Sequence, residues 1–167
     1  MAQKQLIVAA VVIALAGALG GAAALATPGS GILSAPVLAR GAFVDPVDVK
    51  FKLGAGPNDI LHVQNAQDTV VQQIVIAPGG TTGWHSHPGP VIVVMAAGTM
   101  SFYSSEDPSC TATTYSAGQA FIDEGQGHVH FARNEGTENV VLMATYLDVP
   151  PGQGFRIDAA NLGTCGF

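Results

Sequence analysis

Runs of alternating apolar and polar residues recur from Val47 to Val149, separated by turn-forming residues. In residues 47–53, valine, phenylalanine and leucine alternate with Asp48, Lys50 and Lys52, as in a strand with one buried and one wet face. Glycine, proline, asparagine and aspartate between the runs mark turns. The predicted strands are residues 47–53, 60–64, 69–77, 91–95, 100–103, 111–115, 119–122, 128–133 and 139–149.

This pattern predicts an all-β fold. No stretch beyond residue 46 has a sustained helical periodicity, and strands at a spacing of about 8–12 residues are typical of sandwiches and barrels. The chain has 167 residues, which suits one domain with a sizeable core. We therefore predict a single domain over residues 47–167. Residues 27–46, rich in Gly, Pro, Ala and Ser, are expected to be a linker or an N-terminal arm.

Residues 1–26 have the pattern of an export signal. Lys4 supplies a positive charge, residues 6–26 are apolar, alanine or glycine, and Ala24-Leu25-Ala26 offers small residues for cleavage. The apolar run also reaches the length of about 20 residues that spans a bilayer, so an uncleaved membrane anchor is the alternative. Either reading predicts a secreted or extracytoplasmic domain, with a membrane partner only if the segment is retained.

The composition limits the partners. Hydrophobic residues make up 48% of the chain and charged residues 11%, which is typical of a folded β-rich protein and not of a disordered one. The formal net charge is −6, and it becomes −7 without Lys4. Because an acidic surface repels phosphate, we do not expect a nucleic-acid partner. A homodimer is left open.

The two cysteines, Cys110 and Cys165, lie in polar or glycine-containing segments. In an exported domain such a pair is expected to form a disulfide, with two free thiols as the alternative. Neither cysteine has the Cys-x-x-Cys spacing of a zinc site.

Four of the five histidines form two His-x-His pairs, His85 with His87 and His128 with His130. Side chains two residues apart on a strand point the same way, so each pair can place two imidazoles on one ion. The alternative for a single pair is a strand end with two exposed histidines. His62 stands alone and is interpreted as a surface or core residue.

The two histidine segments resemble the motifs of the cupin superfamily. The first motif is a glycine, five residues, His-x-His, three or four residues, a glutamate, six residues and a glycine. Gly79, His85, His87 and Gly98 match it, but Val91 stands at the glutamate position, and Ile92 at the alternative spacing is no ligand either.

The second motif runs from a glycine through Pro-x-Gly to a histidine and an asparagine. Gly118, Gly127, His130 and Asn134 match it, with Gly125 at the proline position and one residue late. The resemblance covers about residues 60–150. It implies a double-stranded β-helix (jelly-roll) cupin barrel with a site inside it.

The resemblance implies that His85, His87 and His130 bind one divalent metal ion. Without the glutamate, a site of three neutral ligands would leave the ion's charge uncompensated and favour anions. His128, two residues before His130, is expected to face the same interior as a fourth ligand or a catalytic base. Its alternative is a hydrogen-bonded histidine at the barrel rim. Imidazole ligands do not distinguish Fe, Zn, Cu, Ni or Mn.

Other side chains are candidates for the pocket. Trp84 adjoins the first histidine pair, and it heads a set of large apolar residues that are either pocket wall or core. The rest of that set is Met95, Phe102, Tyr103, Phe121 and Phe131. Candidate polar groups at the rim are Asp123, Glu124 and Arg133.

The sequence thus predicts an exported metal-binding cupin that acts on a small, anionic molecule. The chemistry expected at such a site is oxygenase-like or hydrolytic. The alternatives are a non-catalytic module that binds a small ligand or the metal, and a purely structural barrel. An enzyme needs an open coordination position and a proton-handling group near it, for which His128 is the candidate.

Overall fold

The computed structural model describes residues 26–56, 59–161, 163, 165 and 166. In these parts of the chain all regular structure is β-strand. The strands are β1 (Ser30–Ser34), β2 (Val37–Ala42), β3 (Val49–Lys52), β4 (Ile60–Val63), β5 (Asp68–Thr81), β6 (His85–Ser86), β7 (Val91–Ala97), β8 (Thr99–Ser104), β9 (Thr113–Ser116), β10 (Ala120–Asp123), β11 (His130–Arg133), β12 (Val140–Val149) and β13 (Ile157–Asp158).

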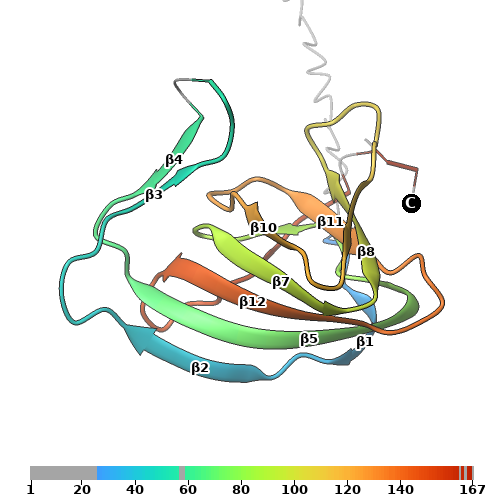
Figure 1. The fold of residues 1–167 in the computed structure, drawn as a ribbon, viewed down its shortest axis with the longest axis horizontal. Coiled ribbons are helices and arrows are strands. Elements are labelled where there is room, and N and C mark those ends of the chain that lie inside the picture. The colour runs from blue at the N-terminus through green and yellow to red at the C-terminus, as the bar shows by residue number, and fades with distance from the viewer. Residues whose placement is uncertain (1–25, 57–58, 162, 164, 167) are drawn as a thin grey trace, which may run out of the picture.

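The strands form a nearly closed antiparallel barrel, which confirms the predicted double-stranded β-helix. One series runs β10-β7-β12-β5, and a second joins β8 and β9 to β11, β6 and β13. The two series meet where Arg133 of β11 pairs with Thr81 at the end of β5. Figure 1 shows β7, β12 and β5 side by side as the curved wall of the barrel.

The barrel core follows from the alternation in the long strands. Val140, Leu142, Ala144 and Tyr146 of β12 are buried, while the residues between them are only partly buried. They pair with β5, where Ile76 lies opposite Val140. A strand with one face on the core has this pattern because side chains alternate between its faces.

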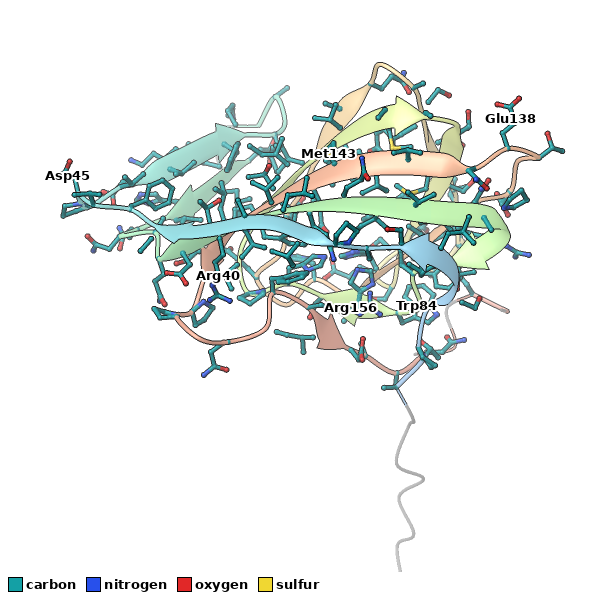
Figure 2. The ribbon with its side chains drawn as sticks, turned by 90° about the horizontal axis from the view of Figure 1, so that it is seen from below. Arg40, Asp45, Trp84, Glu138, Met143 and Arg156 are labelled. Carbon is teal, nitrogen blue, oxygen red and sulfur yellow. A yellow bond between two sulfur atoms is a disulfide. The ribbon has the colours of Figure 1, made fainter. Side chains whose placement is uncertain are left out.

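The prediction of a linker or arm over residues 27–46 misses two strands. β1 and β2 both pair with β5, and they lie along its outer side in Figure 2. Arg40 fixes β2 to the barrel through an ion pair with Asp68 at 2.7 Å. The same guanidinium donates to the carbonyls of Gln153 and Pro150 at 2.7 and 2.8 Å. The N-terminal segment therefore holds the turn that leads from β12 toward the C-terminus.

β3 and β4 form a separate two-stranded sheet, which projects from the barrel in Figure 1. His62 lies on β4 and is only partly buried, outside the group formed by the other buried histidines. This agrees with its interpretation as a surface or core residue. The predicted export signal, residues 1–26, lies outside the described residues except for Ala26. Among the described residues no helix is long and apolar enough to cross a membrane.

Asn134 closes the turn that follows β11. Its side chain is fully buried, and its amide donates to the carbonyls of Ile76 and Glu138 at 2.9 and 2.8 Å. Its Oδ1 accepts from the N–H of Gly136 at 3.0 Å. The asparagine of the second motif is therefore a structural residue that joins β11 and its turn to β5.

Replacing Asn134 with alanine is expected to lower the free energy of unfolding by about 3 kcal/mol. The reason is that buried backbone groups lose their partners, at about 1–3 kcal/mol for each unsatisfied group. Urea unfolding measures the change. Asn139→Ala is the matched control because Asn139 is exposed and follows in the same turn. A loss equal to that of the control would contradict the assigned role.

Candidate metal centre

His85, His87 and His130 meet inside the barrel, as the resemblance predicts. His130 opens β11 and pairs directly with His85 of β6. All three side chains are buried, and one nitrogen from each lies within 4.8 Å of the others. The Nε2 atoms of His85 and His130 are 3.2 Å apart. The alternative of exposed histidines at a strand end is therefore wrong for this cluster.

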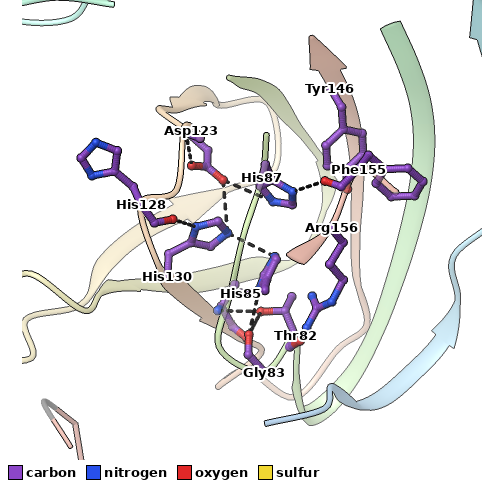
Figure 3. Close-up of polar contacts among 12 residues, drawn as sticks. Thr82, Gly83, His85, His87, Asp123, His128, His130, Tyr146, Phe155 and Arg156 are labelled. Carbon is purple, nitrogen blue, oxygen red and sulfur yellow. Dashed lines mark hydrogen bonds and ion pairs between the residues drawn. The ribbon is translucent and has the colours of Figure 1, made fainter. Parts of the chain in front are cut away.

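Each of these histidines is oriented by a backbone carbonyl. Figure 3 shows the contacts. A carbonyl oxygen only accepts, so each Nδ1 carries the proton and each neutral ring directs an unprotonated Nε2 at the centre. The acceptors are the carbonyls of Gly83 for His85 (2.8 Å), Phe155 for His87 (2.6 Å) and His128 for His130 (3.3 Å).

Burial keeps these rings neutral. It lowers the pKa of His130 to about 4. Burial, together with the neighbouring His130, lowers the pKa of His87 to about 4. The pKa of His85 also falls well below its usual value, because of burial and then the other two histidines. Neutral imidazole is the form that binds a metal, so the cluster is ready to bind at neutral pH.

A buried carboxylate joins the cluster. Asp123 ends β10, and its Oδ2 lies 3.1 Å from Nε2 of His130 and 3.5 Å from Nε2 of His87. Burial raises the pKa of this carboxyl, partly offset by His87 and by the N–H of Gly125. The sequence predicts a rim position for Asp123 and a site without protein charge, and the structure corrects both. Phe121 and Asp123 are two residues apart on β10, so their side chains point the same way, into the barrel. This spacing is the signal in the sequence that could have placed Asp123 inside.

The structure does not bring His128 to the cluster. β11 begins at His130, so His128 lies in the preceding loop, where the strand alternation does not apply. Its side chain is 45% exposed and contacts Glu106 at 3.0 Å and Glu124 at 3.7 Å. Figure 3 shows its ring turned away from His130. The expectation that His128 faces the interior is wrong, and its rim alternative describes the structure.

Of the two alternatives for Trp84, pocket wall or core, the structure shows core. Trp84 alternates with His85 and so faces the other side of the strand, where it packs on Phe131 with ring centroids 5.3 Å apart. Tyr103 and Cys165 complete this second apolar cluster behind the histidines. On the histidine side, Phe102 stacks on His130 at 4.9 Å.

A cavity of about 50 Å³ at the histidines adjoins a larger one of about 330 Å³. The larger cavity is lined by His85, His87, Tyr146, Phe155 and Arg156, among others. Phe155 and Arg156 are not predicted as site residues because they lie after the last predicted strand, in a segment without periodicity. Only the positive charge of Arg156, in an acidic chain, could have signalled a role.

The donor set fits a metal ion. The Nε2 atoms are acceptors, and His85 and His130 place two of them at 3.2 Å without a proton donor between them. A cation relieves this repulsion. Ligand atoms at about 2.0–2.2 Å from a divalent ion lie about 3.0–3.5 Å from one another, which matches the 3.1–3.5 Å between the facing atoms of His130, His85, His87 and Asp123.

The fold and this site define the protein as a member of the cupin family. The cupin domain family matches residues 72–155, half of the chain, which contain the three histidines and Asp123. The chain therefore belongs to this family. A comparison with curated protein sequences finds no match.

Three solved structures are among the similar ones. A cupin-like protein from Thermotoga maritima is 23% identical, with a TM-score of 0.47 over 56% of this chain and 66% of that one. A double-stranded β-helix protein from Klebsiella pneumoniae is 20% identical, with a TM-score of 0.44 over 70% and 85%. A variant of Bacillus subtilis oxalate decarboxylase is 17% identical, with a TM-score of 0.45 over 54% and 23%.

Proposed function

We propose that this chain is an exported cupin that binds one divalent metal ion through His85, His87 and His130. It uses the ion in oxygenase-like or hydrolytic chemistry on a small anionic molecule. The observation that carries the proposal is the convergence of three buried imidazoles whose Nδ1 atoms donate to backbone carbonyls, so that each Nε2 can bind an ion. A bound divalent ion supplies a Lewis acid that polarises an oxygen of the ligand.

Arg156 supports an anionic ligand. It lines the larger cavity together with His85 and His87. Its positive charge contributes to the lowered pKa of His85, His87 and His130, so its field reaches the centre. The guanidinium donates to the carbonyl of Thr82 at 2.7 Å and pairs with Asp158 at 2.6 Å. It has five N–H groups, which leaves donors for a carboxylate.

The shape of the larger cavity supports a small molecule. Its volume of about 330 Å³ lies at the lower end of ligand pockets. Tyr146 and Phe155 form its apolar side, with ring centroids 4.5 Å apart. Phe155 also accepts the Nδ1–H of His87, so the segment that closes the cavity also orients a ligand of the metal.

A non-catalytic binding protein is the second candidate. The observation that favours it is the outward position of His128, which leaves the site without its expected proton-handling histidine. Burial raises the pKa of Tyr146, and its hydroxyl donates to Gln72 at 2.9 Å, so it does not replace that group near neutral pH. Turnover of a bound acid by the metal-loaded protein separates the enzyme from the binder.

The test begins with elemental analysis and titration of the metal-free protein with Zn²⁺, Mn²⁺ and Fe²⁺. One ion per chain is expected. Calorimetry of the loaded protein with acetate, oxalate and succinate then measures anion binding, and Arg156→Gln is expected to weaken it by at least about 10-fold, as a charged hydrogen bond of about 1.5–3 kcal/mol implies.

Arg156→Lys keeps the charge and should retain part of the affinity. Lys50→Gln, which removes an exposed cation of the β3–β4 sheet, controls for the net charge of the protein. Equal anion affinity of Arg156→Gln and the wild type would refute the role of Arg156. A folded wild type that binds none of the metals would refute the metal site.

A further inference from the structure

We infer that Asp123 is a fourth protein ligand of the metal, supplied by β10 in place of the carboxylate that the first motif carries at position 91. The inference rests on the proposed metal site and deepens it. It assigns a specific oxygen, Oδ2, to the ion and gives the centre three nitrogens and one oxygen.

The position of Oδ2 is that of a ligand atom. It lies 3.1 Å from Nε2 of His130 and 3.5 Å from Nε2 of His87, close to the 3.2 Å between His130 and His85. Asp123 lines the same small cavity as the three histidines. Its side chain is 5% exposed, so water does not compensate its charge. A buried carboxylate without a cation is costly, and a metal ion removes that cost.

The loop after β10 orients this carboxylate. The N–H of Gly125 donates to Oδ1 at 3.0 Å, which leaves Oδ2 directed at the histidines. Gly125 has a φ of 60°, and a Cβ at this position would overlap the backbone of Gly89. A proline cannot adopt this φ, so the glycine at the proline position of the motif has a physical reason. The turn that departs from the motif is the turn that positions Asp123.

The pairing of β10 with β7 explains how one carboxylate replaces the other. Asp123 is the direct partner of Val91. Directly opposite residues share one face of a sheet, with Cβ atoms about 4.5–5.5 Å apart. Val91 is buried and lines the cavity beside Asp123. A carboxylate from either strand therefore reaches the same space, and the chain carries it on β10.

A carboxylate ligand also changes the charge of the centre. A divalent ion with three neutral histidines and one aspartate has a net charge of +1, in place of the +2 expected from histidines alone. The remaining charge still favours an anion. Arg156, at the larger cavity, then becomes the second positive charge that the ligand meets.

The test is a titration of the metal-free wild type and variants. Calorimetry measures the binding of Zn²⁺, and absorption spectroscopy records the bands of bound Co²⁺. Asp123→Asn keeps the size of the side chain and is expected to bind Zn²⁺ at least about 10-fold more weakly. It should also change the Co²⁺ absorption bands, because an anionic oxygen ligand is lost. Glu124→Gln, the exposed neighbouring acid, is the matched control and should bind as wild type does.

A transfer of the ligand distinguishes coordination from mere positioning. In Asp123→Ala, the added change Val91→Glu should restore most of the lost affinity from the neighbouring strand. When Asp123 is present, Val91→Glu should add little Zn²⁺ affinity because Asp123 already fills that coordination position. Wild-type Zn²⁺ affinity and Co²⁺ bands in Asp123→Asn would overturn the inference while leaving the three-histidine site intact. Absence of metal binding in folded wild type would overturn both.

Discussion

Replacing His130 with alanine is expected to lower the affinity for Zn²⁺ by more than about 100-fold, since even groups that only orient a ligand contribute 10- to 100-fold. His130 is the centre of the cluster: its Nε2 lies 3.2 Å from His85 and 3.1 Å from Asp123. Its removal takes away one ligand and the contacts of that ligand with His85 and Asp123. Calorimetric titration of the metal-free protein measures the change.

His128→Ala is the matched control. It removes the same residue type two positions earlier, from a side chain that is 45% exposed and paired with Glu106 and Glu124. Its Zn²⁺ affinity is expected to equal that of the wild type, because its backbone carbonyl still accepts from His130. Cooperative unfolding of both variants shows that the barrel is intact. Equal losses in the two variants would contradict the assigned cluster.

The barrel could be predicted because its strands carry their own signal. Each predicted strand overlaps an observed one, and in β12 the buried positions alternate as the sequence does. β1 and β2 could not be predicted in this way. Every residue of these two strands is exposed, so neither strand has a buried face that would require alternation. Apolar residues therefore occur side by side, as in Ile32-Leu33 and Val37-Leu38. Their pairing with β5 is a tertiary contact that local pattern does not encode.

The residues of the candidate site could likewise be predicted only in part. His85 and His87 could be predicted as a pair because their spacing alone sets their direction. Asp123 depends on the register of β10 against β7, which joins residues far apart in the sequence. His128 has the right spacing, but it directly follows the turn at Gly127, which has a φ of 90°, and β11 begins only at His130. Spacing predicts direction only where the backbone stays extended.

The Cys110–Cys165 disulfide, present as predicted, is expected to have the largest effect on stability. It joins residues 55 positions apart, and closing a loop of that length in the unfolded chain contributes about 4 kcal/mol. Reduction, or the double variant Cys110→Ala with Cys165→Ala, should lower the free energy of unfolding by this amount. Urea unfolding with and without reductant measures it, and the two-hydrogen mass deficit identifies the oxidised form.

The same bond is expected to support the metal centre from behind. Cys165 is buried in the cluster with Trp84 and Phe131, whose neighbours along the chain are His85 and His130. Because alternate side chains of a strand face opposite ways, this cluster holds the backbone that presents the histidines. Reduced protein should therefore bind Zn²⁺ more weakly, but less so than His130→Ala. Unchanged unfolding and Zn²⁺ affinity after complete reduction would show that the barrel positions the histidines without the disulfide.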